Sequence, residues 1–223
     1  MVQLPSNLDV SFETGEARLS TYRKAVGGDN VRASRLYMWN ISVSARWWGP
    51  LAYTEVALRN KLHDQLARSV GQEKWWSDPG LAISGHLAKN IDDATKFALR
   101  QSGLESPSAD DVVAASSFGL WTSVLHRDNA QELWRPHVQS DFEPQVKRGV
   151  LYDNTYKLKK LRDRIAHHEP IFAENHHQHV GRLKFVLGAV HPDLPDLVME
   201  WFPGLLCTIE GYDKALDTGI VDL

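Results

Sequence analysis

The segment Lys157–Pro170 reads Lys-Leu-Lys-Lys-Leu-Arg-Asp-Arg-Ile-Ala-His-His-Glu-Pro, and the prediction of the fold begins from it. Leu158, Leu161 and Ile165 recur at helical spacing, which predicts the end of an amphipathic helix. The proline disfavours the α conformation at the residue before it, so the helix is expected to stop near His168. Its last turns then hold two arginines and two histidines. Their charges suit either the negative end of the helix dipole or a phosphate site.

Helical periodicity dominates the rest of the chain. Apolar residues recur at three- and four-residue spacing, whereas alternating runs bounded by turn signals, which would predict strands, are few. We therefore predict an all-α protein, with its main helices over residues 31–69, 83–101, 110–125, 150–168, 182–190 and 194–208. Of the 223 residues, 43% are hydrophobic, which is enough for one sizeable core, and no repeat or linker interrupts the sequence. A single domain over residues 1–223 is expected.

The predicted helix over residues 31–69 carries two apolar stripes that should face the core: Leu36, Trp39, Val43 and Trp47, then Leu51, Leu58, Leu62 and Leu66. Gly49 and Pro50 between them are expected to kink or break the helix. Glu55 falls on the second stripe, where an unpaired carboxylate would be costly. It is expected either to pair with Arg59, four residues on, or to reach together with Asn60 to the basic helix end and orient it.

Tryptophans at helical spacing are more often core residues than a platform for bases, so four are assigned to the core: Trp39, Trp47, Trp121 and Trp201. In each of the doublets Trp47-Trp48 and Trp75-Trp76, one ring is expected to be exposed. At the ends of the chain we expect an irregular arm over residues 4–14 and a loosely held tail after Asp213.

Cys207 is the only cysteine, which excludes an intrachain disulfide and suits a reducing compartment. The first residues do not resemble a signal peptide, and no apolar stretch is long enough to cross a bilayer. We therefore expect a soluble, cytoplasmic protein that makes no contact with a membrane.

The formal net charge of −3 argues against a protein that coats nucleic acid without selectivity. Residues 145–166 differ, because seven Lys and Arg residues stand against two Asp residues there, which leaves five positive charges. Such a basic patch can hold RNA locally. Lys157, Lys159 and Lys160 are expected to bind it.

Three motifs, in the same order along the chain, resemble the Abi-like (abortive infection) branch of the HEPN superfamily. Leu-Arg-Asp-Arg-Ile-Ala-His-His-Glu-Pro-Ile-Phe, from Leu161 to Phe172, resembles its C-terminal signature. Glu55-Val-Ala-Leu-Arg-Asn60 resembles its Glu-x-x-Leu-Arg-Asn helix, and Ser117-Phe-Gly-Leu-Trp121 resembles its Ser-Phe-Gly segment. The resemblance implies a HEPN-like helical bundle with additional peripheral helices. One departure is Asp163, where many HEPN ribonucleases have asparagine.

The resemblance also implies a metal-independent endoribonuclease that needs no cofactor. Such enzymes are often the toxin of a phage-defence or toxin–antitoxin pair, with RNA as substrate and a protein or RNA antitoxin as partner. In Arg162-x-x-x-x-His167, the histidine is expected to move protons and the arginine to clamp the phosphate. Asp163 precedes His167 by four residues and can orient its ring. Arg164 and His168 form a second pair at this spacing, either structural or assisting RNA binding.

Two alternatives remain open in the sequence. His167, His168, Glu169, His176, His177 and His179 crowd together and could bind a metal, but adjacent histidines rarely point at one ion and no cysteine assists. We therefore expect no metal site, and a solvated loop over residues 176–179. The second alternative is a non-catalytic HEPN-type helical module that binds RNA or protein.

A symmetric homodimer is the last prediction from sequence. Residues five apart on an ideal helix differ by about 140° in direction, so Arg162 and His167 of one chain cannot line one narrow face unless the helix end unwinds. Two copies related by a twofold axis remove this difficulty, and HEPN ribonucleases generally pair in this way. Three residues shortly before the motif are expected to supply the interface: Tyr152, Thr155 and Tyr156.

Overall fold

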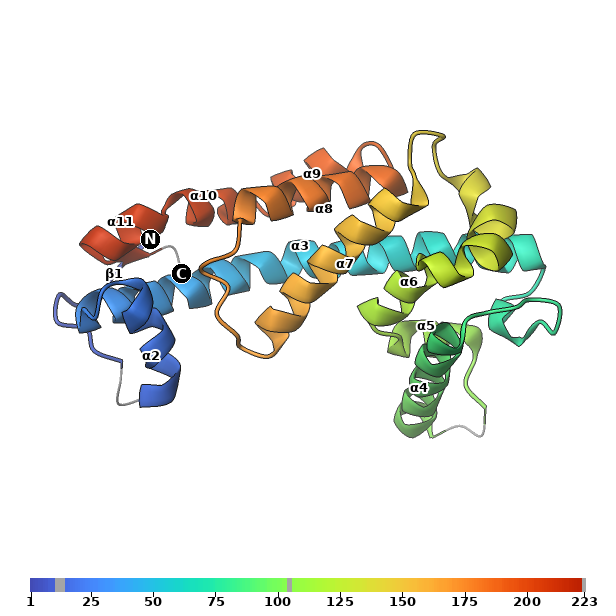
Figure 1. Ribbon diagram of the computed structural model, residues 1–223, viewed down its shortest axis with the longest axis horizontal. Coiled ribbons are helices and arrows are strands. Elements are labelled where there is room, and N and C mark those ends of the chain that lie inside the picture. Colours follow the sequence, from blue (N-terminus) through green and yellow to red (C-terminus); the bar gives the residue numbers. More distant parts are fainter. Residues whose placement is uncertain (11–14, 104–105, 222–223) are drawn as a thin grey trace. The chain divides into compact units, whose positions relative to one another are not determined.

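The computed structural model describes residues 1–10, 15–103 and 106–221, and it confirms the predicted all-α class (Figure 1). Within these ranges the only strands are β1 (Val2–Gln3) and β2 (Ile220–Val221), which pair in antiparallel fashion. None of the described helices is long and apolar enough to cross a membrane.

The helical elements follow one another with short connections. In chain order they are α2 (Glu16–Ala25), α3 (Asn30–Val70), η1 (Trp75–Ser77), α4 (Gly85–Ser102), α5 (Ala109–Ala115), α6 (Phe118–Val124), η2 (Arg127–Asn129), η3 (Ala130–Val138), η4 (Gln139–Asp141), α7 (Arg148–Ala166), α8 (His176–Val190), α9 (Leu194–Trp201), α10 (Gly204–Glu210) and α11 (Tyr212–Thr218).

Two of the predicted helices are each divided into two shorter ones. The helix predicted over residues 110–125 is interrupted at Ser116, whose hydroxyl accepts a hydrogen bond from Trp121 Nε1 (2.7 Å) and donates one to a main-chain carbonyl three residues earlier (2.6 Å). A serine that bonds to the nearby main chain competes with the helix. The helix predicted over residues 194–208 is interrupted at Pro203, because proline disrupts a helix interior.

Contacts divide the chain into two compact units, which are described separately. The first unit comprises Met1–Leu51, Leu161–His179 and Leu197–Leu223, and the second comprises Ala52–Lys160 and Val180–Asp196. Several helices, α3 and α7 among them, contribute residues to both units. The single domain expected from the sequence remains a prediction.

The first apolar stripe of α3 lies in the core of the first unit, as predicted. Its four side chains are at most 2% exposed: Leu36, Trp39, Val43 and Trp47. Trp39 Nε1 donates a hydrogen bond to the carbonyl of Thr208 (2.9 Å), and its ring packs edge-on against Tyr212 with centroids 4.8 Å apart. The stripe therefore joins α3 to α10 and α11.

Residues 214–221 of the C-terminal tail are packed within the first unit, so the prediction that the tail is loosely held is wrong for them, and residues 222–223 lie outside the described part of the chain. Ala215 and Leu216 of α11 are buried. Arg35 Nη1, on α3, donates hydrogen bonds to the carbonyls of Leu216 (3.0 Å) and Asp217 (2.8 Å). A polar side chain far away in the sequence thus holds the last helix.

The arm predicted over residues 4–14 begins at Leu4, which is buried and donates its amide hydrogen to the carbonyl of Gly219 (2.8 Å). Residues 4–10 contain no helix or strand, as predicted. Residues 11–14 lie outside the described part of the chain.

Helix α3 runs through Gly49 and Pro50, so the predicted break is wrong, and the alternative of a kink stays a prediction. The ring of Phe202, from the segment between α9 and α10, lies directly on Gly49. A Cβ atom at Gly49 would be 2.3 Å from Phe202 Cε1. Packing of this ring helps to offset the helix hydrogen bond that the proline cannot make.

The second unit contains the remainder of the second stripe, again as predicted. Leu58, Leu62 and Leu66 are fully buried. α4 packs against both α5 and α6, which together form the green group of helices in Figure 1. This group positions the Ser117–Trp121 motif at the start of α6.

The tryptophans follow the predictions with two exceptions, Trp201 and the doublet Trp75-Trp76, in which neither ring is fully exposed. Three of the four expected in the core are buried: Trp39, Trp47 and Trp121. Trp201 is 52% exposed at the C-terminal end of α9, so its assignment to the core is wrong. In the doublets, Trp48 is 48% exposed, as predicted, and Trp76 is half-buried beside a buried Trp75.

Substitution Gly49→Ala is expected to lower the free energy of unfolding by about 1–3 kcal/mol, because overpacking against Phe202 outweighs the gain of about 1 kcal/mol in helix propensity. Gly181→Ala in α8 is the matched control. Nothing lies within 4 Å of its new Cβ, so it should leave stability equal or increase it. Urea unfolding of both variants checks this, and a Gly49→Ala protein as stable as the parent contradicts it.

Candidate functional site

Helix α7, which carries the Arg162–His167 motif and is called the motif helix below, ends near His168 as predicted. The amide of Glu169 donates to the carbonyl of Arg164 (2.8 Å) and that of His168 to the carbonyl of Ile165 (3.0 Å). These two bonds define a Schellman motif, which requires a left-handed residue after the helix. His168 takes this conformation with φ of 56°, and it is the only non-glycine residue of the described chain with positive φ. Its main role in the structure is therefore to end the helix.

Arg162 and Asp163 form an ion pair at the surface of this helix end. Arg162 Nη1 lies 3.5 Å from Asp163 Oδ1, and the two side chains are 31% and 29% exposed. His167 is exposed. Its amide donates to the carbonyl of Asp163 (2.9 Å), which is a helical hydrogen bond. The helix therefore does not unwind before His167, and the angle of about 140° between Arg162 and His167 expected on an ideal helix is kept.

Arg164 clamps the segment that follows the helix. Its Nη1 forms an ion pair with Glu174, its Nη2 donates to the carbonyl of Pro170, and its Nε lies 3.4 Å from Glu169 Oε2. Such charge-assisted contacts are stronger than neutral hydrogen bonds. Of the two roles left open by the sequence, these contacts support the structural one.

Glu174 links this clamp to helix α8. Its Oε2 lies 3.1 Å from Nε2 of His179, whose ring is buried. Burial raises the pKa of the Glu174 carboxyl, but the hydrogen bond with His179 and the charge of Arg164 outweigh it, so the pKa lies below its ordinary value. The carboxylate is thus held in its charged form between two cationic or proton-donating partners.

Helix α8 begins at His176, so the loop predicted over residues 176–179 is wrong, and His176 and His179 are buried instead of solvated. His176 Nδ1 accepts a hydrogen bond from Trp47 Nε1 (3.0 Å), and only 6% of the residue is exposed. Burial, assisted by the nearby His179, lowers the pKa of His176 to about 4. The signal was present in the sequence, because His176, His179 and Leu183 continue the helical spacing of α8 toward its N-terminus.

Asn40 is a further polar residue of this site that the sequence reading missed. It is 5% exposed on α3, and its Oδ1 accepts a hydrogen bond from the amide of Ile171 (2.7 Å). A buried acceptor that binds a main-chain amide fixes the path of the segment after the helix end. Asn40 directly follows Trp39, so a polar side chain beside a core stripe was the available signal.

An apolar pocket of about 530 Å³ lies beside the helix end, within the first unit. Ile165, Ala166 and His168 line it on one side. Ile41 and Trp48 of α3 also line it, and they are 41% and 48% exposed. Large apolar side chains exposed at a pocket are typical of a surface that contacts another molecule.

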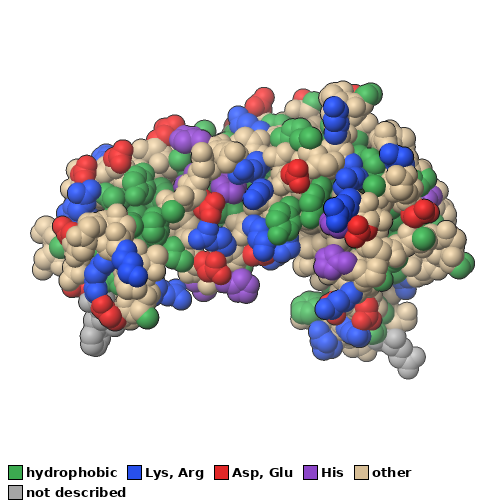
Figure 2. Space-filling view, viewed as in Figure 1, with side chains coloured by type: hydrophobic (Ala, Val, Ile, Leu, Met, Phe, Trp, Pro, Cys, Tyr) green, Lys and Arg blue, Asp and Glu red, His purple; other side chains and the backbone are tan. Residues whose placement is uncertain are grey.

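The other predicted site residues lie in the second unit. Glu55 is half-buried, and Asn60 Oδ1 accepts a hydrogen bond from Arg59 Nε (3.2 Å). Contact of Glu55 or Asn60 with the motif helix end remains a prediction. Figure 2 shows several Lys and Arg side chains in the region of α7, with carboxylates and hydrophobic side chains among them. Three of the basic residues of this helix were predicted to bind RNA: Lys157, Lys159 and Lys160.

Of the three residues predicted for a twofold interface, Thr155 is fully buried in its own chain, so that part of the prediction is wrong. Tyr152 and Tyr156 are half-buried and stack on each other. Over the described residues, no group of three or more His, Cys, Asp or Glu side chains is arranged to hold a metal ion.

Comparison of the chain with models of known protein families, with curated proteins and with solved structures finds no match. The site is therefore interpreted from its own geometry and from the motifs in the sequence.

The free energy of unfolding is expected to fall by about 2 kcal/mol between about pH 7.5 and pH 5, owing to His176. Its pKa is about 4 in the folded chain against an ordinary 6.5, so acid protonates the unfolded state first and favours it. Urea unfolding across this range measures the slope. His176→Gln should flatten the slope, whereas His177→Gln, an exposed neighbour, should keep it. An unchanged slope in His176→Gln contradicts the assignment.

Proposed function

We propose that the protein is an endoribonuclease that cleaves RNA without a metal ion. The observation that carries the proposal is the helix end at Arg162–His167. There the guanidinium of Arg162, about a third exposed, and the exposed imidazole of His167 lie at a helix end that Arg164 and Glu174 hold in place. Guanidinium groups bind phosphate, and imidazole is the side chain best suited to move protons near neutral pH. These are the two groups that RNA cleavage requires.

In the proposed reaction the ribose 2′-oxygen attacks the adjacent phosphorus while the bond from phosphorus to the 5′-oxygen breaks. The products are a 2′,3′-cyclic phosphate and a 5′-hydroxyl. His167 takes the proton of the 2′-hydroxyl, and a protonated imidazole returns one to the leaving 5′-oxygen. Arg162 stabilises the charge that develops on the phosphate oxygens. Asp163, in its ion pair with Arg162, positions the guanidinium.

The biological setting is proposed from the resemblance of the three motifs to the Abi-like HEPN branch. On this basis the protein acts in the cytoplasm as the RNA toxin of a phage-defence or toxin–antitoxin pair, restrained by a protein or RNA antitoxin. The lysines of α7, namely Lys157, Lys159 and Lys160, support RNA as the substrate, since phosphate contacts supply most of the affinity for nucleic acid.

Purified protein incubated with total RNA in EDTA is expected to cleave it. Arg162→Ala and His167→Ala should each reduce the rate at least roughly 100-fold, because one removes the phosphate clamp and the other the proton carrier. His177→Ala removes an exposed histidine from the next helix and should leave the rate unchanged. End-labelling of the fragments should reveal 5′-hydroxyl groups.

Other outcomes separate the alternatives. Cleavage that EDTA abolishes would indicate a metal-dependent enzyme. RNA binding without cleavage by any variant would indicate a non-catalytic helical module. Cleavage that survives in both Arg162→Ala and His167→Ala would place the active site elsewhere and overturn the assignment.

The active form is proposed to be a symmetric homodimer. Arg162 and His167 leave an intact helix about 140° apart, so one chain does not bring both to one phosphate, whereas two facing helix ends do. The apolar pocket beside the helix end supports this arrangement. Its exposed Trp48 and Ile41 offer a self-complementary surface next to the motif.

Arg162→Ala and His167→Ala chains carrying different affinity tags should therefore regain activity when co-expressed and purified through both tags. Each mixed dimer retains one arginine and one histidine that can meet across the cleft. Trp48→Glu should convert the protein to a monomer in light scattering and lower its activity. A mixed dimer no more active than its parents, or a fully active monomer, contradicts the proposal.

A further inference from the structure

Another cavity, lined by more polar residues than the apolar pocket of the first unit, lies entirely within the second unit. It measures about 320 Å³ and is lined by residues of α4, α6 and α7 and of the segment after α6. This volume is at the lower end of the range for small-ligand pockets, so it suits one nucleotide-sized molecule. No carboxylate is among the described residues that line it, whereas two lysines and two histidines are.

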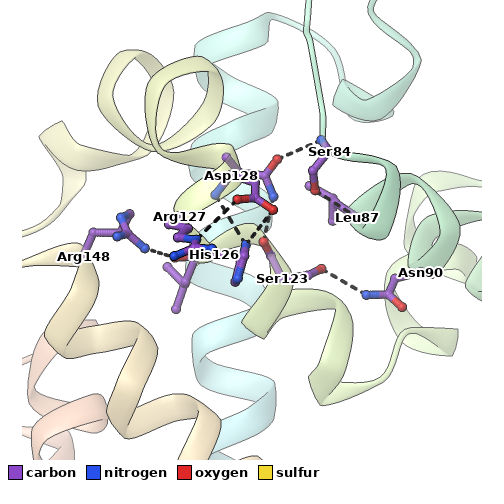
Figure 3. A network of polar contacts seen from close by, with 10 residues as sticks. Ser84, Leu87, Asn90, Ser123, His126, Arg127, Asp128 and Arg148 are labelled. Carbon is purple, nitrogen blue, oxygen red and sulfur yellow. Dashed lines mark hydrogen bonds and ion pairs between the residues drawn. The ribbon is translucent and has the colours of Figure 1, made fainter.

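Hydrogen bonds hold one wall of this cavity in place, as Figure 3 shows. Asn90 Nδ2 donates to Ser123 Oγ (3.1 Å), which in turn donates to the carbonyl of Leu120 (2.6 Å). His126 Nδ1 lies 3.2 Å from Asp128 Oδ2, and this contact helps to fix the orientation of the imidazole ring. The wall is therefore built before any ligand arrives, which lowers the entropic cost of binding.

The α7 wall combines aromatic rings with positive charge. Tyr152 and Tyr156 stack with centroids 5.9 Å apart, and His126 packs edge-on against Tyr152 at 5.4 Å. Lys160 Nζ lies 5.6 Å from the centroid of Tyr156, and Lys159 lines the same cavity. Proteins that bind nucleotides commonly stack the base on aromatic side chains and bind the phosphate with nearby cations.

Two residues of the Ser-Phe-Gly segment, Ser117 and Gly119, contribute to the α6 wall. Ser117 occupies the N-cap of α6. A serine at this position commonly makes a capping hydrogen bond, but the hydroxyl of Ser117 makes none. Gly119 allows the stem of Lys159 to lie across the helix, because a Cβ there would be 3.3 Å from Lys159 Cε and 3.3 Å from Ser117 Oγ. This segment therefore leaves a hydroxyl available and brings a lysine to the cavity.

We infer that this cavity binds one nucleoside phosphate, with the base against the tyrosine and histidine rings and the phosphate at Lys159 and Lys160. This inference rests on the proposed function only in naming the source of the ligand. That source is a nucleotide unit of an RNA strand and not a free nucleotide. Ser117 and Asn90 supply hydrogen-bonding groups for the base or ribose. The site is separate in residues from Arg162 and His167.

The test measures binding in the His167→Ala background, so that it can be read whether or not the protein cleaves RNA. A fluorescein-labelled single-stranded hexaribonucleotide is titrated by anisotropy. Lys160→Glu should weaken its binding at least about tenfold. Lys184→Glu makes the same charge change at an exposed residue of α8 in the same unit that does not line the cavity, and it should weaken binding much less.

Ser117→Ala should weaken binding several-fold without changing the melting temperature, because the lost hydroxyl caps no helix. Uridine and adenosine monophosphates should compete with the labelled strand for the cavity and displace it. Inorganic phosphate at equal ionic strength should not. Tighter binding of the mononucleotides than of the strand would identify a free nucleotide as the ligand and contradict the stated source. Equal losses in Lys160→Glu and Lys184→Glu, or no loss in either, would overturn the cavity as a binding site.

Discussion

The contact between Arg164 and Glu174 is the constraint on which the candidate site depends. It joins the last turn of α7 to the segment that leads into α8, while the same guanidinium also binds the carbonyl of Pro170. Removing one member of a partly buried ion pair leaves the other charge unpaired, which costs more than the pair itself gains. The turn at His167 is therefore held in place by Glu174, which lies outside the motif and does not need to contact RNA.

The sequence predicted local features well because helical periodicity is a local property. The stripes of α3, the all-α class and the end of α7 near His168 all depend on residues within a few turns of one another. The failures involve contacts between distant segments. The ring of Phe202 on Gly49 and the hydrogen bonds of Arg35 to the last helix join residues far apart in the chain, and no spacing rule reveals them.

The candidate site divides in the same way. Arg162 and His167 could be named from their spacing, their position at a helix end and their chemistry. The roles of Asn40 and Glu174 could not, because each acts on the motif through a partner that only the fold brings close, even though the position of Asn40 beside a core stripe was visible. His176 was visible as a helical position but was taken for a solvated residue. A histidine cluster looks the same in sequence whether its rings are hydrated or packed on Trp47.

Basic residues that look alike in the sequence of α7 have different physical roles in the structure. Arg164 binds two carboxylates and a carbonyl, whereas Arg162 keeps about a third of its side chain exposed and pairs with Asp163. Lys160 lies over an aromatic ring at the edge of a cavity. Because affinity for phosphate depends on charge that is not already satisfied, five net positive charges in one segment do not amount to five equivalent contacts. The partners of each cation, more than their number, determine where this chain can bind RNA.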